Sequence, residues 1–229
     1  MIDMHTHILP GVDDGPASVE ESILMIQKGV AEGIKTFVLT PHYRDDADWS
    51  RVDSVAAAYD SLKHMCRERG IEADLILGGE VHICEGLAQK LKENPLATLG
   101  GRGSYVLVEL PFTQLPVYTS DVLFRLLTAR YIPVIAHPER CLYLEGNLKL
   151  INKWVEDGIL LQMNTGSLND RYGQAVKKLA RKLLKDGLVH FWGSDVHSIR
   201  DEFNFDKAKG MPDNEIRNLT MLLCGTFGA

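Results

Sequence analysis

The stretch MIDMHTHILPGVDDGP, residues 1–16, sets a pattern that the rest of the chain repeats. It opens with a short apolar run, residues 1–5, which we predict to be a β-strand. Two histidines and two aspartates follow at the end of that strand and in the loop after it. Side chains two positions apart on an extended segment point to the same face, so His5 and His7 could hold one ion together. The stretch therefore predicts a strand that delivers potential metal ligands to the loop at its carboxyl end.

Similar short apolar runs recur along the chain and alternate with segments of helical periodicity. We predict further strands at residues 36–40, 74–78, 105–110, 132–136, 159–163 and 188–193. Most are apolar throughout, which is typical of parallel strands covered on both faces. We predict helices after a capping box at Ser18, over 52–66, from Thr119 or Ser120 to near Ala129, over 176–183, and from 212 or 213 onward. This alternation predicts βα units around a parallel sheet, which forms either a closed or distorted barrel or a doubly wound open sheet.

The bulk composition excludes several classes of protein. The 229 residues carry 25 Lys and Arg against 31 Asp and Glu, a net charge of −6, which argues against a nucleic-acid binder and a polybasic membrane patch. No apolar run approaches the roughly 20 residues that cross a bilayer, so we expect no membrane insertion. No linker or repeat divides the chain, so we expect one domain over residues 1–229. The N-terminus lacks signal-peptide features and the four cysteines form no CxxC pair, so a reducing cytoplasm is the expected compartment.

Polar side chains of ligand type follow most of the predicted strands. They are His5 and His7 after the first strand, His42 in TPHYR after the second, Glu80 in GGEVH after the third, Glu109 in LVELPF at the end of the fourth, His137 in AHPER after the fifth, and Asp195 and His197 in GSDVHS after the seventh. Only the sixth strand end, residues 163–165, lacks a strong ligand. In a parallel barrel all carboxyl strand ends face one rim, so these residues should meet there.

The remaining candidates have simpler explanations. An isolated histidine or acid at a strand end is more often an ordinary loop residue, and it is the joint pattern that favours a site. We expect His64 to be a partly exposed helix residue, His190 to be hydrogen-bonded near the core, and His82 to have a loop role or to support a ligand. Asp13 and Asp14 either form a turn in DDG, or one of them supplies an oxygen ligand.

These motifs, in this order, resemble the PHP (polymerase and histidinol phosphatase) superfamily. HILPGVDDGP, TPHYR, HPER and GSDVH look more specifically like the bacterial tyrosine phosphatases of capsule and exopolysaccharide synthesis, of the CpsB/YwqE type. The resemblance covers essentially the whole chain and implies an α/β fold, a distorted (β/α)7 TIM-like barrel. It further implies a hydrolase that removes phosphate from phosphotyrosine, with the tail of a bacterial tyrosine autokinase as substrate.

The resemblance also implies three divalent metal ions, with manganese preferred and iron, zinc, cobalt or magnesium as alternatives. The implied ligands are His5, His7, Glu80 and Asp195 for one ion, Glu80, Glu109 and His137 for a second, and Asp14, His42 and His197 for the third. Many PHP relatives have histidine where this chain has Glu109 and Asp14, and both acids match the tyrosine-phosphatase branch. Four acidic ligands against three divalent ions leave the centre positive, which favours a phosphate dianion.

Arginines near the rim are the candidates for holding the phosphate through bidentate hydrogen bonds. Arg140 is the first candidate, Arg200 the second and Arg44 the third, each with a surface salt bridge as the simpler alternative. No cysteine is followed by arginine at the sixth position, so a cysteine nucleophile is not expected. A tyrosyl leaving group, with a pKa of about 10, needs less acid assistance than an alkyl alcohol, and His42 or a metal-bound water is the hypothetical acid.

Two alternatives remain open from the sequence. One is another PHP phosphoesterase, such as a histidinol phosphatase, and the other is a metal-binding regulator without catalytic activity. Substrate comparison separates the enzymes, and the presence of metal without hydrolysis would identify the regulator. The oligomeric state cannot be inferred from the sequence.

Overall fold

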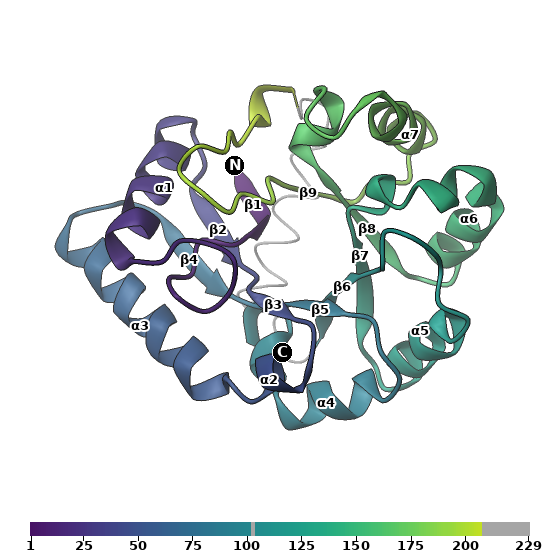
Figure 1. The fold of residues 1–229 in the computed structure, drawn as a ribbon, viewed down its shortest axis with the longest axis horizontal. Helices are drawn as coiled ribbons and strands as arrows, with labels where there is room; N and C mark the ends of the chain where they lie inside the picture. The colour runs from purple at the N-terminus through teal and green to yellow at the C-terminus, as the bar shows by residue number, and fades with distance from the viewer. Residues whose placement is uncertain (102–103, 208–229) are drawn as a thin grey trace, which may run out of the picture.

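The computed structural model describes residues 1–101 and 104–207, and its strands curl around a common axis with helices outside (Figure 1). The strands are β1 (Ile2–Thr6), β2 (Thr36–Leu39), β3 (His42–Tyr43), β4 (Asp74–Leu77), β5 (Glu80–His82), β6 (Tyr105–Glu109), β7 (Ile132–Ala136), β8 (Leu160–Asn164) and β9 (Phe191–Gly193). Every pairing between these strands is parallel. The prediction of a parallel sheet is therefore confirmed.

The predicted strands at 36–40 and 74–78 correspond to β2 and β4, and each is followed by a further short strand, β3 or β5, that the sequence did not predict. Pro41 separates β2 from β3, and because proline has no N–H it cannot donate to the sheet. Gly79 lies between β4 and β5, where an added Cβ would lie 2.6 Å from the Tyr43 ring. The glycine lets this aromatic side chain pack against the strand backbone.

The strands form two hydrogen-bonded sheets, in the orders β1-β2-β4 and β3-β5-β6-β7-β8-β9. The two sheets are connected on one side, because the chain passes directly from β2 to β3 and from β4 to β5. On the other side, the backbone N–H of Asp195 donates to His5 (2.9 Å) and that of His7 donates to Val196 (3.0 Å). These bonds join the segment after β9 to β1, so the sheet closes as a distorted barrel rather than remaining an open doubly wound sheet.

Helices cover the outside of the barrel between successive strands (Figure 1). They are α1 (Val19–Ala31), α2 (Asp46–Trp49), α3 (Val52–Glu68), α4 (Leu87–Glu93), α5 (Thr119–Thr128), α6 (Leu148–Glu156) and α7 (Gln174–Lys185). Short 3₁₀ helices lie at Pro95–Ala97, Leu99–Gly101, Pro138–Arg140, Leu142–Asn147, Thr165–Leu168 and Phe205–Lys207. No helix among the described residues is long and apolar enough to cross a membrane.

The start of α1 agrees with its sequence signal. The Ser18 hydroxyl accepts from the backbone N–H of Glu21 at 3.2 Å, as an N-cap does. The Glu21 carboxylate accepts from the N–H of Ala17 (3.3 Å) instead of that of Ser18, so the capping box is displaced by one residue.

Two local predictions were wrong and one lies outside the described residues. The N-cap of α5 is Tyr118, because the hydroxyl of Thr119 donates to the Pro116 carbonyl (2.7 Å) and does not cap the helix. The second concerns Asp46-Ala47-Asp48, which follows no predicted strand and which the sequence favours as a solvated loop; Asp46 instead begins the short helix α2, whose first turn is capped by the Asp45 carboxylate. The helix predicted from residue 212 onward lies outside the described residues.

The core consists of layers on both sides of the barrel wall. Inside the barrel, a small apolar cluster includes Met4, Val38, Leu107, Val134 and Phe191, each from a different strand. Larger clusters lie between the wall and the helices. The candidate site lies beyond this apolar filling, at the carboxyl ends of the strands.

Candidate metal centre

All nine residues that the sequence singled out as ligands lie in one cluster at the carboxyl ends of the strands. We call this the rim cluster: His5, His7, Asp14, His42, Glu80, Glu109, His137, Asp195 and His197. The register of β1 against β2 shifts between Asp3 and Thr6, close to His5. Such irregularities turn side chains at functional sites.

Glu80 lies at the centre of the rim cluster and is almost fully buried. Its Oε2 atom lies 3.3 Å from Nε2 of both His5 and His7 and 3.0 Å from Nδ1 of His42. Its other oxygen lies 2.9 Å from Nε2 of His137. One carboxylate thus faces four imidazoles from different parts of the barrel.

Asp195 and Glu109 extend the cluster on either side of Glu80. Asp195 Oδ1 lies 3.6 Å from Nε2 of both His5 and His7, and 3.7 Å from Nδ1 of His197. Glu109 Oε1 lies 4.0 Å from Nε2 of His137. Asp195 and His137 have positive φ angles of 55° and 31°, a strained conformation that is concentrated at functional sites.

Asp14, His42 and His197 form the outer part of the cluster. Asp14 Oδ1 lies 3.4 Å from Nε2 of His42 and 3.5 Å from Nε2 of His197. The imidazole rings of His7 and His197 stack with their centroids 4.0 Å apart. Unlike the buried core of the cluster, Asp14 is half exposed, so this part faces solvent.

Hydrogen bonds to the opposite ring nitrogens orient two of the imidazoles. Nδ1 of His7 donates to Asp13 Oδ2 (2.8 Å), and Nδ1 of His5 donates to Gln162 Oε1 (3.0 Å). In the neutral imidazole, each bond leaves the Nε2 lone pair directed into the cluster, the form that binds a metal. The Gln162 amide in turn donates to Asn164 Oδ1 (2.9 Å), whose own amide donates to Asp195 Oδ2 (2.7 Å).

These orienting residues were missed or left ambiguous in the sequence. The sixth strand end was expected to lack a strong ligand, yet β8 supplies Gln162 and Asn164, which hold His5 and Asp195 in place. Asp13 was considered as either a turn residue or an oxygen ligand, and it accepts from His7 and from the N–H groups of Gly15 and His42. Of these orienting residues, only Asp13 had a signal in the sequence, namely its place in the DDG turn.

The protonation equilibria reflect the density of buried acids. Burial raises the pKa of the Glu109 carboxyl, and the nearby Glu80 raises it further, to about 8. Burial opposes a charge on His5, but the carboxylates of Glu80 and Asp195 raise its pKa to about 9. The cluster therefore favours additional positive charge.

The donor set fits divalent metal ions. Three groups of side chains have ligand atoms within 4.8 Å of one another: His7, Asp14, His42 and His197; His5, His7 and Glu80; and His42, Glu80 and Glu109. Among the described residues, the buried atoms Glu80 Oε2, His42 Nδ1 and His137 Nδ1 have no hydrogen-bond partner. Imidazole and carboxylate together suit zinc, manganese or iron.

The arginines differ in their relation to the rim cluster. Arg140 Nη1 donates to Asp195 Oδ2 (2.7 Å), and Arg44 Nη2 donates to Asp14 Oδ2 (3.2 Å). Arg200 is exposed, and within residues 1–101 and 104–207 no hydrogen bond or ion pair joins it to the cluster. The geometry thus brings Arg140 and Arg44 to the site.

Two of the other three histidines are where the sequence suggested. His64 is exposed on α3 and lies 3.2 Å from the carboxylate of Glu68. His190 is half-buried, and its Nδ1 accepts from the backbone N–H of Leu161 at 3.1 Å. His82, expected in a loop, is instead half-buried in the strand β5, and it belongs to none of the three groups.

Comparison of the sequence with models of known protein families gives a match over most of the chain. Residues 1–203 match the family model described as "Capsular polysaccharide synthesis, CpsB/CapC". The chain belongs to the CpsB/CapC family. The resemblance inferred from the motifs is therefore confirmed.

Individual relatives extend this comparison. The tyrosine-protein phosphatase YwqE from Bacillus subtilis is 34% identical to this CpsB/CapC family member over 200 residues, 87% of this chain and 78% of YwqE. One similar crystal structure comes from a study of YwqE from Bacillus subtilis and CpsB from Streptococcus pneumoniae, described as "unique metal-dependent tyrosine phosphatases". It matches this chain with a TM-score of 0.87 and 32% identity, and the match covers 97% of this chain and 94% of that one. A histidinol phosphate phosphatase from Lactococcus lactis has a TM-score of 0.56 at 11% identity, and the match covers 95% of this chain and 92% of that one. This last similarity supports the PHP fold alone.

Proposed function

We propose that this CpsB/CapC family protein is a metal-dependent protein-tyrosine phosphatase of capsule or exopolysaccharide synthesis. The observation that carries the proposal is the convergence of four imidazoles on the Glu80 carboxylate. The metal-dependent tyrosine phosphatase activity named for the relatives supports the same chemistry.

We propose that the rim cluster holds three divalent ions, preferably manganese. Its ligands are His5, His7, Glu80 and Asp195 for one ion, Glu80, Glu109 and His137 for the second, and Asp14, His42 and His197 for the third. The geometry supports the first and third sets directly. For the second ion, the group of ligand atoms within 4.8 Å of one another contains His42 together with Glu80 and Glu109. His137, the proposed third ligand of that ion, has its Nε2 4.0 Å from Glu109 Oε1.

Divalent ions in such a site polarise the phosphoryl group and activate water for in-line attack. The chain's own residues would then bind and orient the substrate. Arg140 has Nη1 on Asp195 and offers its remaining N–H groups to phosphate oxygens, and Arg44 lies on the solvent side beside Asp14. Arg200 remains a further candidate for phosphate binding.

His42 is better placed as a ligand than as the general acid. Its Nδ1 faces Glu80, and its Nε2 faces Asp14 and contacts Arg44 Nη2, so both ring nitrogens are already directed at neighbours in the site. A tyrosyl group leaves as a phenolate of pKa about 10 and needs less protonation than an alkyl alcohol. The chemistry of this leaving group therefore does not require a separate general acid.

The proposed substrate is a phosphotyrosine-containing protein, with the tail of a bacterial tyrosine kinase as the specific partner and the cytoplasm as the compartment. The net charge of −6 argues against nucleic-acid substrates. Histidinol phosphate is the alternative substrate, because the fold is shared with a histidinol phosphate phosphatase.

The test is phosphate release from a phosphotyrosine peptide by protein of measured metal content, before and after chelation and after manganese is restored. We expect chelation to abolish turnover, manganese to restore it, and histidinol phosphate to be a poor substrate. Glu80→Gln should lower kcat/KM by at least about 100-fold, since removing one catalytic electrostatic group typically costs that much. Glu72→Gln, the same change at an exposed residue, is the matched control.

Absence of hydrolysis under every metal condition would contradict the proposed activity. Bound metal without hydrolysis of any phosphomonoester would identify a regulator instead. Preferential turnover of histidinol phosphate would assign the other enzyme class.

A further inference from the structure

An exposed phenylalanine lies beside the rim cluster and has no part in the proposed metal chemistry. Phe112 follows the end of β6, three residues after Glu109, and its side chain is 42% exposed. Its ring centroid lies 5.6 Å from that of His137. An apolar ring is thus presented to solvent directly next to a strongly polar site.

Phe112 also contacts the arginine proposed to hold phosphate. The guanidinium carbon of Arg140 lies 4.5 Å from the Phe112 ring centroid and 4.7 Å from that of Tyr172. Arg140 Nη1 donates to Asp195 at the same time. Two rings and one carboxylate therefore fix the direction in which Arg140 presents its free N–H groups.

The two aromatic residues differ in their exposure. Tyr172 is half-buried, and its hydroxyl accepts from the Asn164 amide at 3.4 Å, which ties it to the interior network. Phe112 retains a large accessible surface next to the place where Arg140 would meet a phosphate. That surface is open to the group esterified to the phosphate.

We propose that Phe112 is a specificity-determining residue, which packs against the aromatic ring of the substrate while Arg140 binds its phosphate. The proposal rests on the proposed phosphatase function and names the substrate class of the same site: aryl phosphates in preference to alkyl phosphates. A phenyl ring gains from burial against another ring, whereas a small alkyl group offers little surface to Phe112.

The alternative is that Phe112 only supports Arg140. In that case its loss would weaken every phosphate ligand equally, because Arg140 contacts the part that all such ligands share. If Phe112 contacts the esterified group, its loss would weaken aromatic ligands selectively. The ratio of two affinities therefore separates the two roles.

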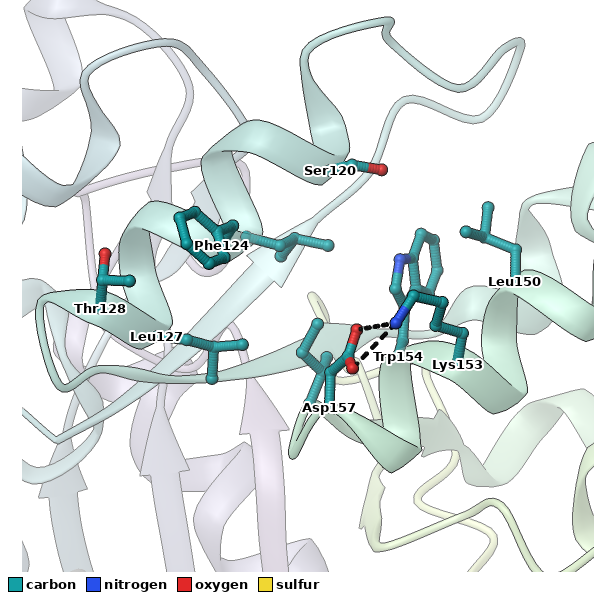
Figure 2. Close-up of a pocket in the computed structure, with 10 residues that line it drawn as sticks. Ser120, Phe124, Leu127, Thr128, Leu150, Lys153, Trp154 and Asp157 are labelled. Atoms are coloured by element: carbon teal, nitrogen blue, oxygen red, sulfur yellow. Dashed lines mark hydrogen bonds and ion pairs between the residues drawn. The ribbon is translucent and has the colours of Figure 1, made fainter.

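The test is calorimetric binding of phenylphosphonate and methylphosphonate to the manganese-loaded protein. Both carry the same anionic head and neither is hydrolysed, so the measurement does not depend on turnover. The variants are Phe112→Leu and Phe112→Tyr, with Tyr172→Leu to remove the other ring on Arg140. Phe124→Leu is the matched control, since Phe124 is 64% exposed and lines a separate hollow between α5 and α6 (Figure 2).

We expect the unaltered protein to bind phenylphosphonate more tightly than methylphosphonate. Phe112→Leu should weaken phenylphosphonate by about three- to tenfold more than it weakens methylphosphonate, while Phe112→Tyr keeps the preference. Tyr172→Leu should weaken both ligands by a similar factor, and Phe124→Leu neither.

Equal weakening of both ligands by Phe112→Leu would overturn the proposal, as would the absence of a preference in the unaltered protein. Loss of the preference in Phe112→Tyr would also overturn it, because that variant keeps the ring. Failure of the proposed phosphatase function is seen separately, in the hydrolysis of the phosphotyrosine peptide.

Discussion

At the scale of the residue, the candidate site depends on side chains that orient other side chains. Each of His5 and His7 has one ring nitrogen hydrogen-bonded to Gln162 or Asp13 and the other directed at Glu80. These bonds select the tautomer in which Nε2 is free to bind a metal. The orienting residues should therefore matter nearly as much for metal affinity as the ligands.

Asp13 provides the sharpest test at this scale. We expect Asp13→Asn to lower the metal affinity by about 10- to 100-fold, because the carboxylate that orients His7 and increases its basicity is lost. The measurement is competition for manganese with a chromophoric chelator. The matched control is Asp60→Asn, the same change at an exposed position on α3. Unchanged affinity in Asp13→Asn would mean that Asp13 only shapes the turn.

At the scale of the element, closure of the barrel depends on close contact between β9 and β1. A Cβ added at Gly193 would lie 2.4 Å from the His5 Cβ and 3.0 Å from its backbone nitrogen. Only glycine lets the two backbones approach this closely while His5 keeps its position. The glycine that precedes the SDVH motif thus supports both the fold and the site.

Gly193→Ala should therefore destabilise the protein by about 1–3 kcal/mol, because the backbone at His5 must move to admit the methyl group. Urea unfolding followed by circular dichroism measures the effect. Gly146→Ala is the control, since a Cβ there meets no atom within 4 Å. Native stability in Gly193→Ala would show that the contact between β1 and β9 can relax without cost.

At the scale of the whole molecule, the rim cluster gathers residues from both sheets at the carboxyl ends of the strands. Its acids and imidazoles are mostly buried, and within the described part of the chain three of their atoms, Glu80 Oε2, His42 Nδ1 and His137 Nδ1, make no hydrogen bond. Burying such groups is unfavourable unless a counter-charge compensates them. Ions that bind the folded barrel should therefore stabilise the entire fold.

We expect chelation to lower the thermal unfolding temperature and manganese to restore it. A ligand present at 1,000 times its Kd stabilises the folded state by about 4 kcal/mol. Thermal unfolding with and without chelator measures the shift, which should be much smaller in Glu80→Gln. An equal shift in that variant would place the stabilising ion elsewhere.

Most of the fold was predictable because hydrophobic periodicity is a local property. The predicted strands at 36–40 and 74–78 correspond to β2 and β4, but their continuations β3 and β5 were not anticipated. The short strands β3 and β5, which follow Pro41 and Gly79, form only because β3 pairs with β5 and β5 pairs with β6. The local sequence pattern does not reveal such pairing. The start of α5 was misplaced because the Thr119 hydroxyl binds a turn carbonyl rather than capping the helix.

The sequence by itself determined the parallel βα architecture and the set of ligand-type residues at the strand ends. It could do so because strand direction brings all those ends to one rim, whatever the details of packing. Only the tertiary structure decided which residues orient the ligands and which ring lies on Arg140. His5 and Gln162 are 157 positions apart, and Phe112, Arg140 and Tyr172 come from three separate segments that follow different strands. Such contacts depend on which side chains pack together across the barrel, and the spacing of residues in the sequence does not predict that packing.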